Sequence, residues 1–227
     1  RDRGALVHCD ATQLVGREPV AGLTLDALDA DLVTISAHKF GGPAGVGALL
    51  VRPGVSLCAL QGGHQEEGLR AGTENLLGIL GAAAAAEALP DRRAQSPAVR
   101  TRRETLWRGL AGLPGAIRAV AGGQRADSGH VLSVAFAGLD AVDVVMAMDL
   151  EGVAVSAGAA CASGTTEPSH VFAAMWPEGP PDGPAGLQRS VVRISLGPET
   201  TDDMVQGAIE RFAAALGRLR GAAAPRP

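Results

Sequence analysis

Short apolar runs, each bounded by Gly, Pro or Asp, alternate with stretches of helical spacing along most of the chain. Runs of this length are typical of buried strands, and the longer stretches between them are typical of helices. The predicted strands lie at residues 6–9, 32–36, 46–51, 116–120, 131–136, 153–156 and 191–196. The predicted helices lie at residues 74–89, 98–113, 141–150, 169–176 and 202–219. This alternation predicts α/β or α+β layers.

A polar, turn-rich segment at residues 90–97 separates the first predicted elements from the rest. We place a domain boundary there, so that residues 1–93 form one domain and residues 94–227 form another. Thr73 stands just before the first predicted helix and is its predicted N-cap.

The chain of 227 residues is 46% hydrophobic and carries a formal charge of −4. It can therefore bury a substantial core, and its charge gives no electrostatic attraction for nucleic acid or an anionic membrane. Six arginines at residues 92–108 stand among acidic side chains, which predicts a solvated helix face. No apolar run approaches the about 18 residues of a membrane span and no signal peptide is visible, so we expect a cytoplasmic setting.

The three cysteines, Cys9, Cys58 and Cys161, show no CxxC spacing, so neither a disulfide framework nor a zinc site is expected. Cys9 and Cys58 have apolar neighbours and are predicted to be buried. Cys161 stands in a loop of Gly, Ala and Ser, where a thiol is accessible and can react once it is deprotonated.

Lys39 is the single lysine beside 19 arginines. Arginine cannot replace a lysine whose amine must lose its proton and act as a nucleophile. Lys39 follows a predicted strand and precedes a glycine-rich loop, where α/β sheets bind ligands. With Ser36 and His38 beside it, the amine suits an aldehyde cofactor. A surface lysine, a plain turn and a phosphate loop are the alternatives, although GxxxxGK[ST] is absent.

Asp10 ends the first predicted strand, and Gln13 follows three residues later. A carboxylate at this place can cap the next helix. It can also pair with a protonated pyridine nitrogen and so make the ring an electron sink. Because Lys39 also suits such a cofactor, we favour the second interpretation.

The segment at residues 62–75 is too polar and too rich in glycine for a core element. It is expected to be a loop that opens onto a helix N-terminus, where backbone amides and the Thr73 hydroxyl can bind a phosphate.

Several motifs in order along nearly the whole chain carry a resemblance to a known family. They are Asp-Ala-Thr-Gln at residues 10–13, Ser-Ala-His-Lys-Phe at 36–40, Gly-Val-Gly-Ala at 45–48, Gly-His-Gln-Glu at 63–66, Arg-Ala-Gly-Thr-Glu-Asn at 70–75, Ala-Cys-Ala-Ser-Gly at 160–164, Glu-Pro-Ser-His-Val at 167–171 and Val-Arg-Ile-Ser-Leu-Gly at 192–197. Together they closely resemble the pyridoxal-phosphate-dependent cysteine desulfurases of the NifS/IscS type, in the class V aminotransferase family. The resemblance implies a fold-type I transferase, with part of the large cofactor domain at residues 1–93 and the small α+β domain at 94–227.

The resemblance also implies roles at the cofactor. Lys39 resembles the lysine that binds pyridoxal phosphate covalently and later moves the substrate's Cα proton. Asp10 is similar to the partner of the pyridinium nitrogen, and Gln13 to the donor near the ring 3-oxygen. Ser36 and His38 resemble further cofactor contacts.

Three more residues match positions that act on substrate or across a dimer. Thr73 resembles a phosphate ligand that reaches the other subunit, which implies a homodimer. Arg193 resembles the arginine that binds the carboxylate of L-cysteine. Cys161 matches the nucleophile that takes the sulfur as a persulfide while alanine is released. Its loop resembles the branch that passes sulfur to an acceptor or scaffold protein for iron–sulfur cluster assembly or tRNA thiolation.

Some features depart from the family pattern. Ala44 stands where a basic residue is usual, and Gly41 where a bulkier one is usual. The family's ring-stacking His, its Asn near the 3-oxygen and its phosphate turn lie upstream of the motifs found here. We therefore expect this chain to be the C-terminal portion of a longer enzyme, with weak cofactor binding and poor turnover when isolated. The alternatives are a related lyase or aminotransferase, such as a selenocysteine lyase, and a non-catalytic truncated paralogue.

Overall fold

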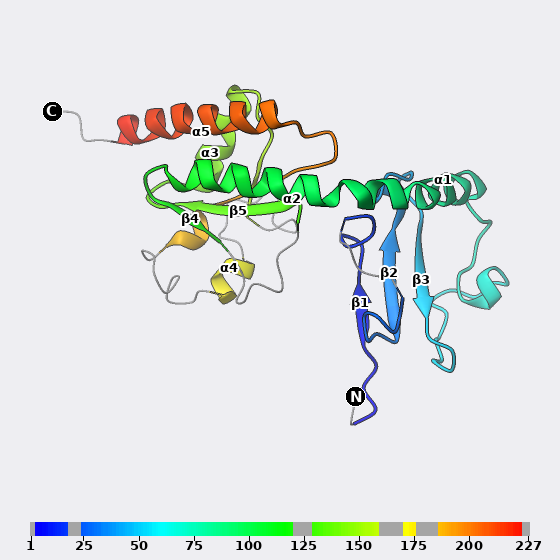
Figure 1. Ribbon diagram of the computed structural model, residues 1–227. Coiled ribbons are helices and arrows are strands. Elements are labelled where there is room, and N and C mark those ends of the chain that lie inside the picture. Colours follow the sequence, from blue (N-terminus) through cyan, green and yellow to red (C-terminus); the bar gives the residue numbers. More distant parts are fainter. Residues whose placement is uncertain (1–2, 18–23, 120–128, 159–169, 176–185, 224–227) are drawn as a thin grey trace. The chain divides into compact units, whose positions relative to one another are not determined.

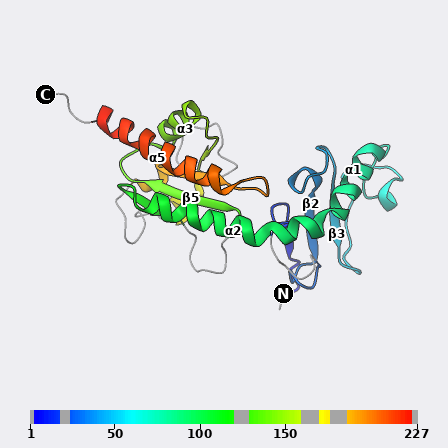
Figure 2. The same ribbon diagram turned by 45° about the horizontal axis from the view of Figure 1, so that its top comes forward.

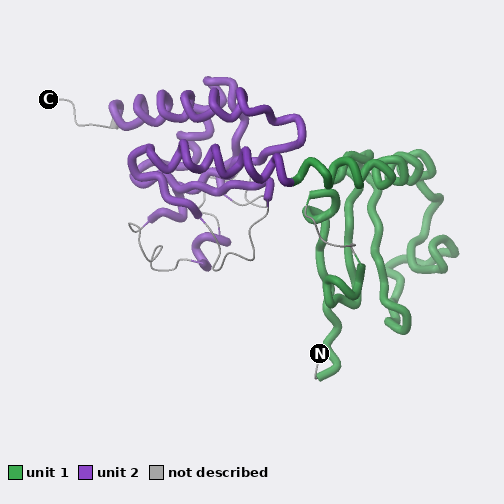
Figure 3. Tube along the Cα trace, in the orientation of Figure 1, with its two compact units in different colours: residues 1–96 green, residues 97–227 purple. Residues whose placement is uncertain are grey.

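The computed structural model describes residues 3–17, 24–119, 129–158, 170–175 and 186–223 (Figure 1). The chain divides into two compact units, Arg1–Ser96 and Pro97–Pro227 (Figure 3). Helix α2, Leu89–Ala111, begins in the first unit and continues into the second. Among the described residues, no helix is both long and apolar enough to cross a membrane.

The first unit contains a three-stranded sheet in the order β1-β2-β3. Its strands are β1 (His8–Asp10), β2 (Leu32–Ser36) and β3 (Gly47–Val51). β1 runs parallel to β2, and β2 runs antiparallel to β3. The described part of the unit also contains two 3-10 turns, η1 (Ala37–Lys39) and η2 (Glu66–Gly68), helix α1 (Leu76–Glu87) and the first residues of α2.

Two small apolar clusters hold the first unit together. One is centred on the buried side chains of Ala11, Ala30 and Val33. The other gathers Val15, Ala37 and Phe40, against which Ala82, Ala85 and Leu89 pack. The second cluster lies directly beneath η1, so the turn that carries Lys39 rests on packed side chains.

The second unit contains a four-stranded sheet in the order β4-β5-β7-β6. Its elements are β4 (Ala116–Arg118), β5 (Val131–Phe136), α3 (Ala141–Leu150), β6 (Ser156–Ala157), α4 (His170–Met175), η4 (Leu187–Arg189), β7 (Val191–Ser195) and α5 (Asp202–Ala223). All described strand pairs of this sheet are antiparallel.

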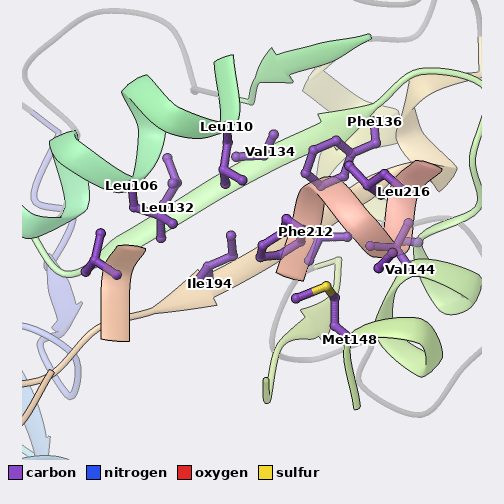
Figure 4. Close-up of a cluster of buried hydrophobic side chains, with 14 of the residues drawn as sticks. Leu106, Leu110, Leu132, Val134, Phe136, Val144, Met148, Ile194, Phe212 and Leu216 are labelled. Carbon is purple, nitrogen blue, oxygen red and sulfur yellow. The ribbon is translucent and has the colours of Figure 1, made fainter. Parts of the chain in front are cut away.

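The core of the second unit lies between this sheet and three helices. Strand residues alternate between faces, so every second side chain of β5 and β7 points to α2, α3 and α5. Figures 1 and 2 both show α2 and α5 beside β5. The cluster includes Leu106, Leu110, Leu132, Val134, Phe136, Val144, Met148, Ile194, Phe212 and Leu216 (Figure 4). On the other face, Ala135 and Val191 pack with Phe172 of α4 and Leu187 of η4.

The structure confirms the mixed layers of strands and helices, but corrects several local predictions. The segment at residues 90–97 is helical throughout, because α2 starts at Leu89 and packs on both units' clusters. The N-cap of α1 is Asn75, whose side chain accepts a hydrogen bond from the Gly78 amide at 3.1 Å, rather than Thr73.

Three further side chains differ from expectation in their exposure. Arg103, expected on a solvated face, is only 2% exposed, because α2 turns it toward β5. Cys58 is exposed and Cys9 is half-buried, although both were expected to be buried. Cys58 follows β3, belongs to no described strand or helix and is exposed among the described residues.

Candidate active site at the carboxyl edge of the first sheet

Two parallel strands end at the same edge of the first sheet. β1 ends at Asp10, which lies in register with Thr34, and β2 ends two residues further on at Ser36. Because parallel strands place their carboxyl ends at one edge, Asp10 and the turn after Ser36 lie beside each other. This edge is where α/β sheets bind ligands.

Asp10 presents an exposed carboxylate at this edge. Its Oδ1 accepts a hydrogen bond from the Thr12 backbone amide at 3.0 Å. This bond lowers the pKa of Asp10 below its usual value, with further lowering from the Thr12 hydroxyl and from nearby His8. The carboxylate therefore stays ionised and can pair with a cationic ring nitrogen. The capping interpretation is partly right, because Asp10 caps a turn at residues 12–17 rather than a helix.

The lysine turn, residues 37–42, carries the amine. Its backbone is closed by the Phe40 and Gly42 amides, which donate to the Ala37 carbonyl at 3.0 and 2.9 Å. Ala37 and Phe40 are buried beneath it, and Lys39 is half-buried. The Ser36 hydroxyl and His38 Nδ1 are 2.8 Å apart, so these two polar side chains form a pair before the lysine.

Gln13 and Thr73 are both exposed side chains of the first unit. Gln13 stands in the turn after Asp10. Thr73 belongs to the predicted loop at residues 62–75, where the Gly72 amide donates to Gln65 Oε1 at 3.2 Å. Since Asn75 caps α1, the Thr73 hydroxyl is not used as the helix cap.

Arg193 lies in the second unit, in the middle of β7. It is in register with Ser133 of β5 and Ser156 of β6, and it is half-buried. By strand alternation it shares a face with Val191, opposite the large core. A guanidinium between two serines can bind a carboxylate. Cys161 lies outside the described residues.

The structure thus brings together Asp10, Ser36, His38 and Lys39 at one sheet edge. It also reveals groups that the sequence analysis missed, namely the Thr12 amide on Asp10 and the guanidinium of Arg17, whose Nη2 donates to the Lys39 carbonyl at 3.1 Å. Neither had a signal in the sequence, because any residue can supply a backbone amide and one arginine among 19 does not stand out.

Comparison with known proteins identifies the family. The model of the class-V aminotransferases matches residues 1–207. A cysteine desulfurase of Enterobacter agglomerans is 36% identical over 221 residues, covering 96% of this chain and 52% of the relative. A cysteine desulfurase of Cereibacter sphaeroides is 40% identical, covering 96% of this chain and 53% of the relative. The chain therefore spans about half the length of the curated relatives it matches.

Solved structures give the same result. A NifS-like protein superimposes with a TM-score of 0.79 at 30% identity, covering 96% of this chain and 54% of that protein. A NifS-like protein of Rickettsia africae has a TM-score of 0.77 at 27% identity, covering 92% and 53%. These matches confirm the predicted fold class and the resemblance read from the motifs. The chain belongs to the class-V aminotransferase family.

Proposed function

We propose that this chain takes part in the pyridoxal-phosphate-dependent desulfuration of L-cysteine, which yields L-alanine and a persulfide on the protein. The observation that carries the proposal is the edge at which Asp10 lies beside the turn with Ser36, His38 and Lys39. The cysteine desulfurases among the relatives support the choice of reaction.

The residues at this edge fit the cofactor. Lys39 supplies a primary amine for an aldehyde, and Asp10, whose pKa is lowered by the Thr12 hydrogen bonds, supplies a carboxylate for a pyridinium. The pair of Ser36 and His38 adds polar contacts at the same edge. A sheet edge that offers an amine, a carboxylate and these polar side chains suits a charged heterocyclic aldehyde.

Pyridoxal phosphate, when bound, supplies an aldehyde for amines and a ring that accepts the electron pair released at the substrate's Cα. Asp10 would keep the ring nitrogen protonated, and Gln13 would donate toward the ring 3-oxygen. Lys39 would bind the cofactor covalently and then carry a proton to or from Cα. Ser36 and His38 would orient the ring.

The remaining assignments belong to the same proposal. Arg193 would bind the substrate carboxylate in a bidentate pair, and Thr73 would bind phosphate across a homodimer. The Cys161 thiolate would attack the substrate sulfur and hold it for a sulfur-acceptor protein. Residues 1–93 would be the C-terminal part of the large domain and residues 94–227 the small domain.

The test is a reaction of the chain with pyridoxal phosphate and L-cysteine at enzyme excess. We expect alanine, together with one added sulfur atom on the peptide that contains Cys161. Lys39→Ala should abolish both products, and Cys161→Ser should abolish the sulfur transfer. Mass spectrometry of the protein and chromatography of alanine measure the two products.

Cys58→Ser is the matched control, because it removes an exposed thiol from the first unit without touching the proposed site. This variant should behave as the unchanged chain does. Alanine release that survives Cys161→Ser at the unchanged rate would overturn Cys161 as the group that takes the sulfur, and a failure of the unchanged chain to release alanine from L-cysteine would overturn desulfuration.

A further inference from the structure

Arg17 holds the lysine turn from one side. It lies in the turn at residues 12–17, and its Nη2 donates to the Lys39 carbonyl across 22 positions of sequence at 3.1 Å. The side chain is half-buried, and Val15, two residues earlier, belongs to the cluster that contains Phe40. A charged donor on the carbonyl of Lys39 fixes the backbone from which the amine projects.

Arg92 covers the same turn from α2. Its guanidinium lies over Gly41, where a Cβ would stand only 2.7 Å from Cζ and 2.9 Å from Nη1 of Arg92. Gly41 also has a φ of +97°, a conformation that favours glycine. The absence of a side chain at residue 41 therefore gives Arg92 its place on the turn.

The positive charges of the Arg17 and Arg92 guanidiniums also repel each other. Burial lowers the pKa of Arg17, and the nearby charge of Arg92 lowers it further. Two like charges are held near one short turn, which costs free energy unless the turn compensates for it. The Lys39 carbonyl provides part of that compensation.

We propose that Arg17 and Arg92 are positioning residues that clamp the lysine turn and so present the Lys39 amine to the aldehyde of the cofactor. The inference rests on the proposed function for the role of the amine. The clamp itself rests on contacts within the first unit alone.

The test exploits the fact that Lys39 is the only lysine in the chain. The chain is incubated with limiting pyridoxal phosphate, treated with borohydride and mapped by mass spectrometry for pyridoxyl-Lys39. A second sample is methylated with formaldehyde and borohydride, because that aldehyde is too small to need an oriented lysine. Amide exchange of the peptide covering residues 37–42 reports the turn itself.

Arg17→Met keeps the apolar stem and removes the donor. We expect about tenfold less pyridoxyl-Lys39 and about tenfold faster exchange in residues 37–42, with formaldehyde methylation unchanged. Arg17→Lys retains a charged donor and should restore most of the pyridoxyl labelling, with peptide mapping separating Lys39 from the added amine. Arg3→Met, at an exposed position of the same unit, is the matched control and should change nothing.

If Arg17→Met does not fold, Arg92→Met still tests the clamp, because this variant keeps the hydrogen bond from Arg17 to the Lys39 carbonyl. We expect a smaller loss of pyridoxyl-Lys39, about threefold, in the same direction. Wild-type exchange and labelling in both variants would overturn the clamp. If the unchanged chain labels Lys39 no better than a peptide of residues 34–44 does, the proposed function fails, while the exchange measurement still decides the clamp.

Discussion

The two units bury their apolar side chains to different extents. In the second unit, one large cluster joins β5 and β7 to three helices, and a smaller one covers the opposite face of the sheet. In the described part of the first unit, two clusters of three buried residues each hold the fold. Helix α1 leaves Leu76, Leu77 and Leu80 at 66%, 84% and 66% exposure.

Because of this difference, the larger share of buried apolar contacts lies in the second unit, while most of the proposed cofactor ligands lie in the first. The second unit gains its stability from a sheet covered on both faces, and its proposed substrate ligand Arg193 lies within that sheet. The first unit places its polar groups at a sheet edge, above a thin layer of packed side chains. Local opening should therefore require less free energy in the first unit than in the second.

The largest expected effect is in the second unit's core. Phe212 is fully buried and its ring centroid lies 5.6 Å from that of Phe136. Phe212→Ala should lower the free energy of unfolding by about 3–5 kcal/mol, because it removes a packed ring and leaves a cavity. Both tryptophans, at residues 107 and 176, belong to this unit, so their fluorescence during denaturant unfolding reports it selectively.

Met204→Ala is the control on the same helix, since Met204 is 59% exposed. It should change the unfolding free energy by less than about 0.5 kcal/mol. A loss below about 1 kcal/mol for Phe212→Ala would show that the second unit is not held by this core, and the contrast between the units would be lost.

A smaller effect is expected at the cap of α1. Asn75→Ala should destabilise this helix by about 1 kcal/mol, because the Gly78 amide loses its acceptor. In the loosely covered first unit, this loss should appear as faster amide exchange at the start of α1 while the tryptophan-monitored transition stays unchanged. Thr73→Ala is the matched control, and equal acceleration by both variants would restore Thr73 as the cap.

Local sequence pattern predicted the elements that are closed by clear signals. The strands at 32–36 and 131–136 and the helix at 141–150 have the predicted bounds, since each apolar run is flanked by Gly, Asp or a turn. The prediction of a turn-rich segment at 90–97 was wrong, because it relied on the two prolines of this segment. Pro90 lies in the first helical turn, where its missing N–H costs little, and the helix continues through Pro97 with Val99, Leu106 and Leu110 packed beneath it.

The candidate site was predictable in its residue types but not in its supports. A lone lysine after a strand and an aspartate at a strand end pointed to the sheet edge that the structure forms. The Arg17 bond to the Lys39 carbonyl and the Arg92 contact over Gly41 depend on long-range packing. No local pattern encodes such contacts, because each joins segments distant in sequence.

Glu104 gives the second unit a pH-dependent contribution. Hydrogen bonds from Arg118, at 3.0 and 2.9 Å, lower the pKa of Glu104, and Arg103 lowers it further. A depressed carboxylate pKa stabilises the fold above about pH 4.3, the usual Glu value, and this stability is lost as the pH falls through the lower, folded pKa. Glu104→Gln should lower the free energy of unfolding by about 0.5–1 kcal/mol at pH 7, a small value because the pair is partly exposed. The variant should also lose less stability than the unchanged chain as the pH falls.

Tryptophan-monitored unfolding between pH 3 and pH 7 measures this effect. Glu210→Gln is the control, because Glu210 is an exposed carboxylate of α5 whose hydrogen bond comes from Gln206 at 3.1 Å. It should keep the slope of the unchanged chain. An unaltered slope in Glu104→Gln would mean that the arginines do not stabilise the ionised Glu104 in solution.

The smallest effect on stability is expected where the first unit exposes apolar surface. Leu77 is 84% exposed on α1, so Leu77→Gln removes little packing and should change the free energy of unfolding by less than about 0.5 kcal/mol. The same change at the buried Leu216 of the second unit should cost several kcal/mol, because a polar amide would enter the core without a partner.

Contiguous exposed leucines favour association, so Leu77→Gln should also reduce the apparent mass in sedimentation at high concentration. Ala83→Gln, on an exposed position of the same helix, controls for the added amide and should leave the mass unchanged. A large loss of stability in Leu77→Gln would show that the α1 surface is packed within the isolated chain, which would make the two units alike in how they are held.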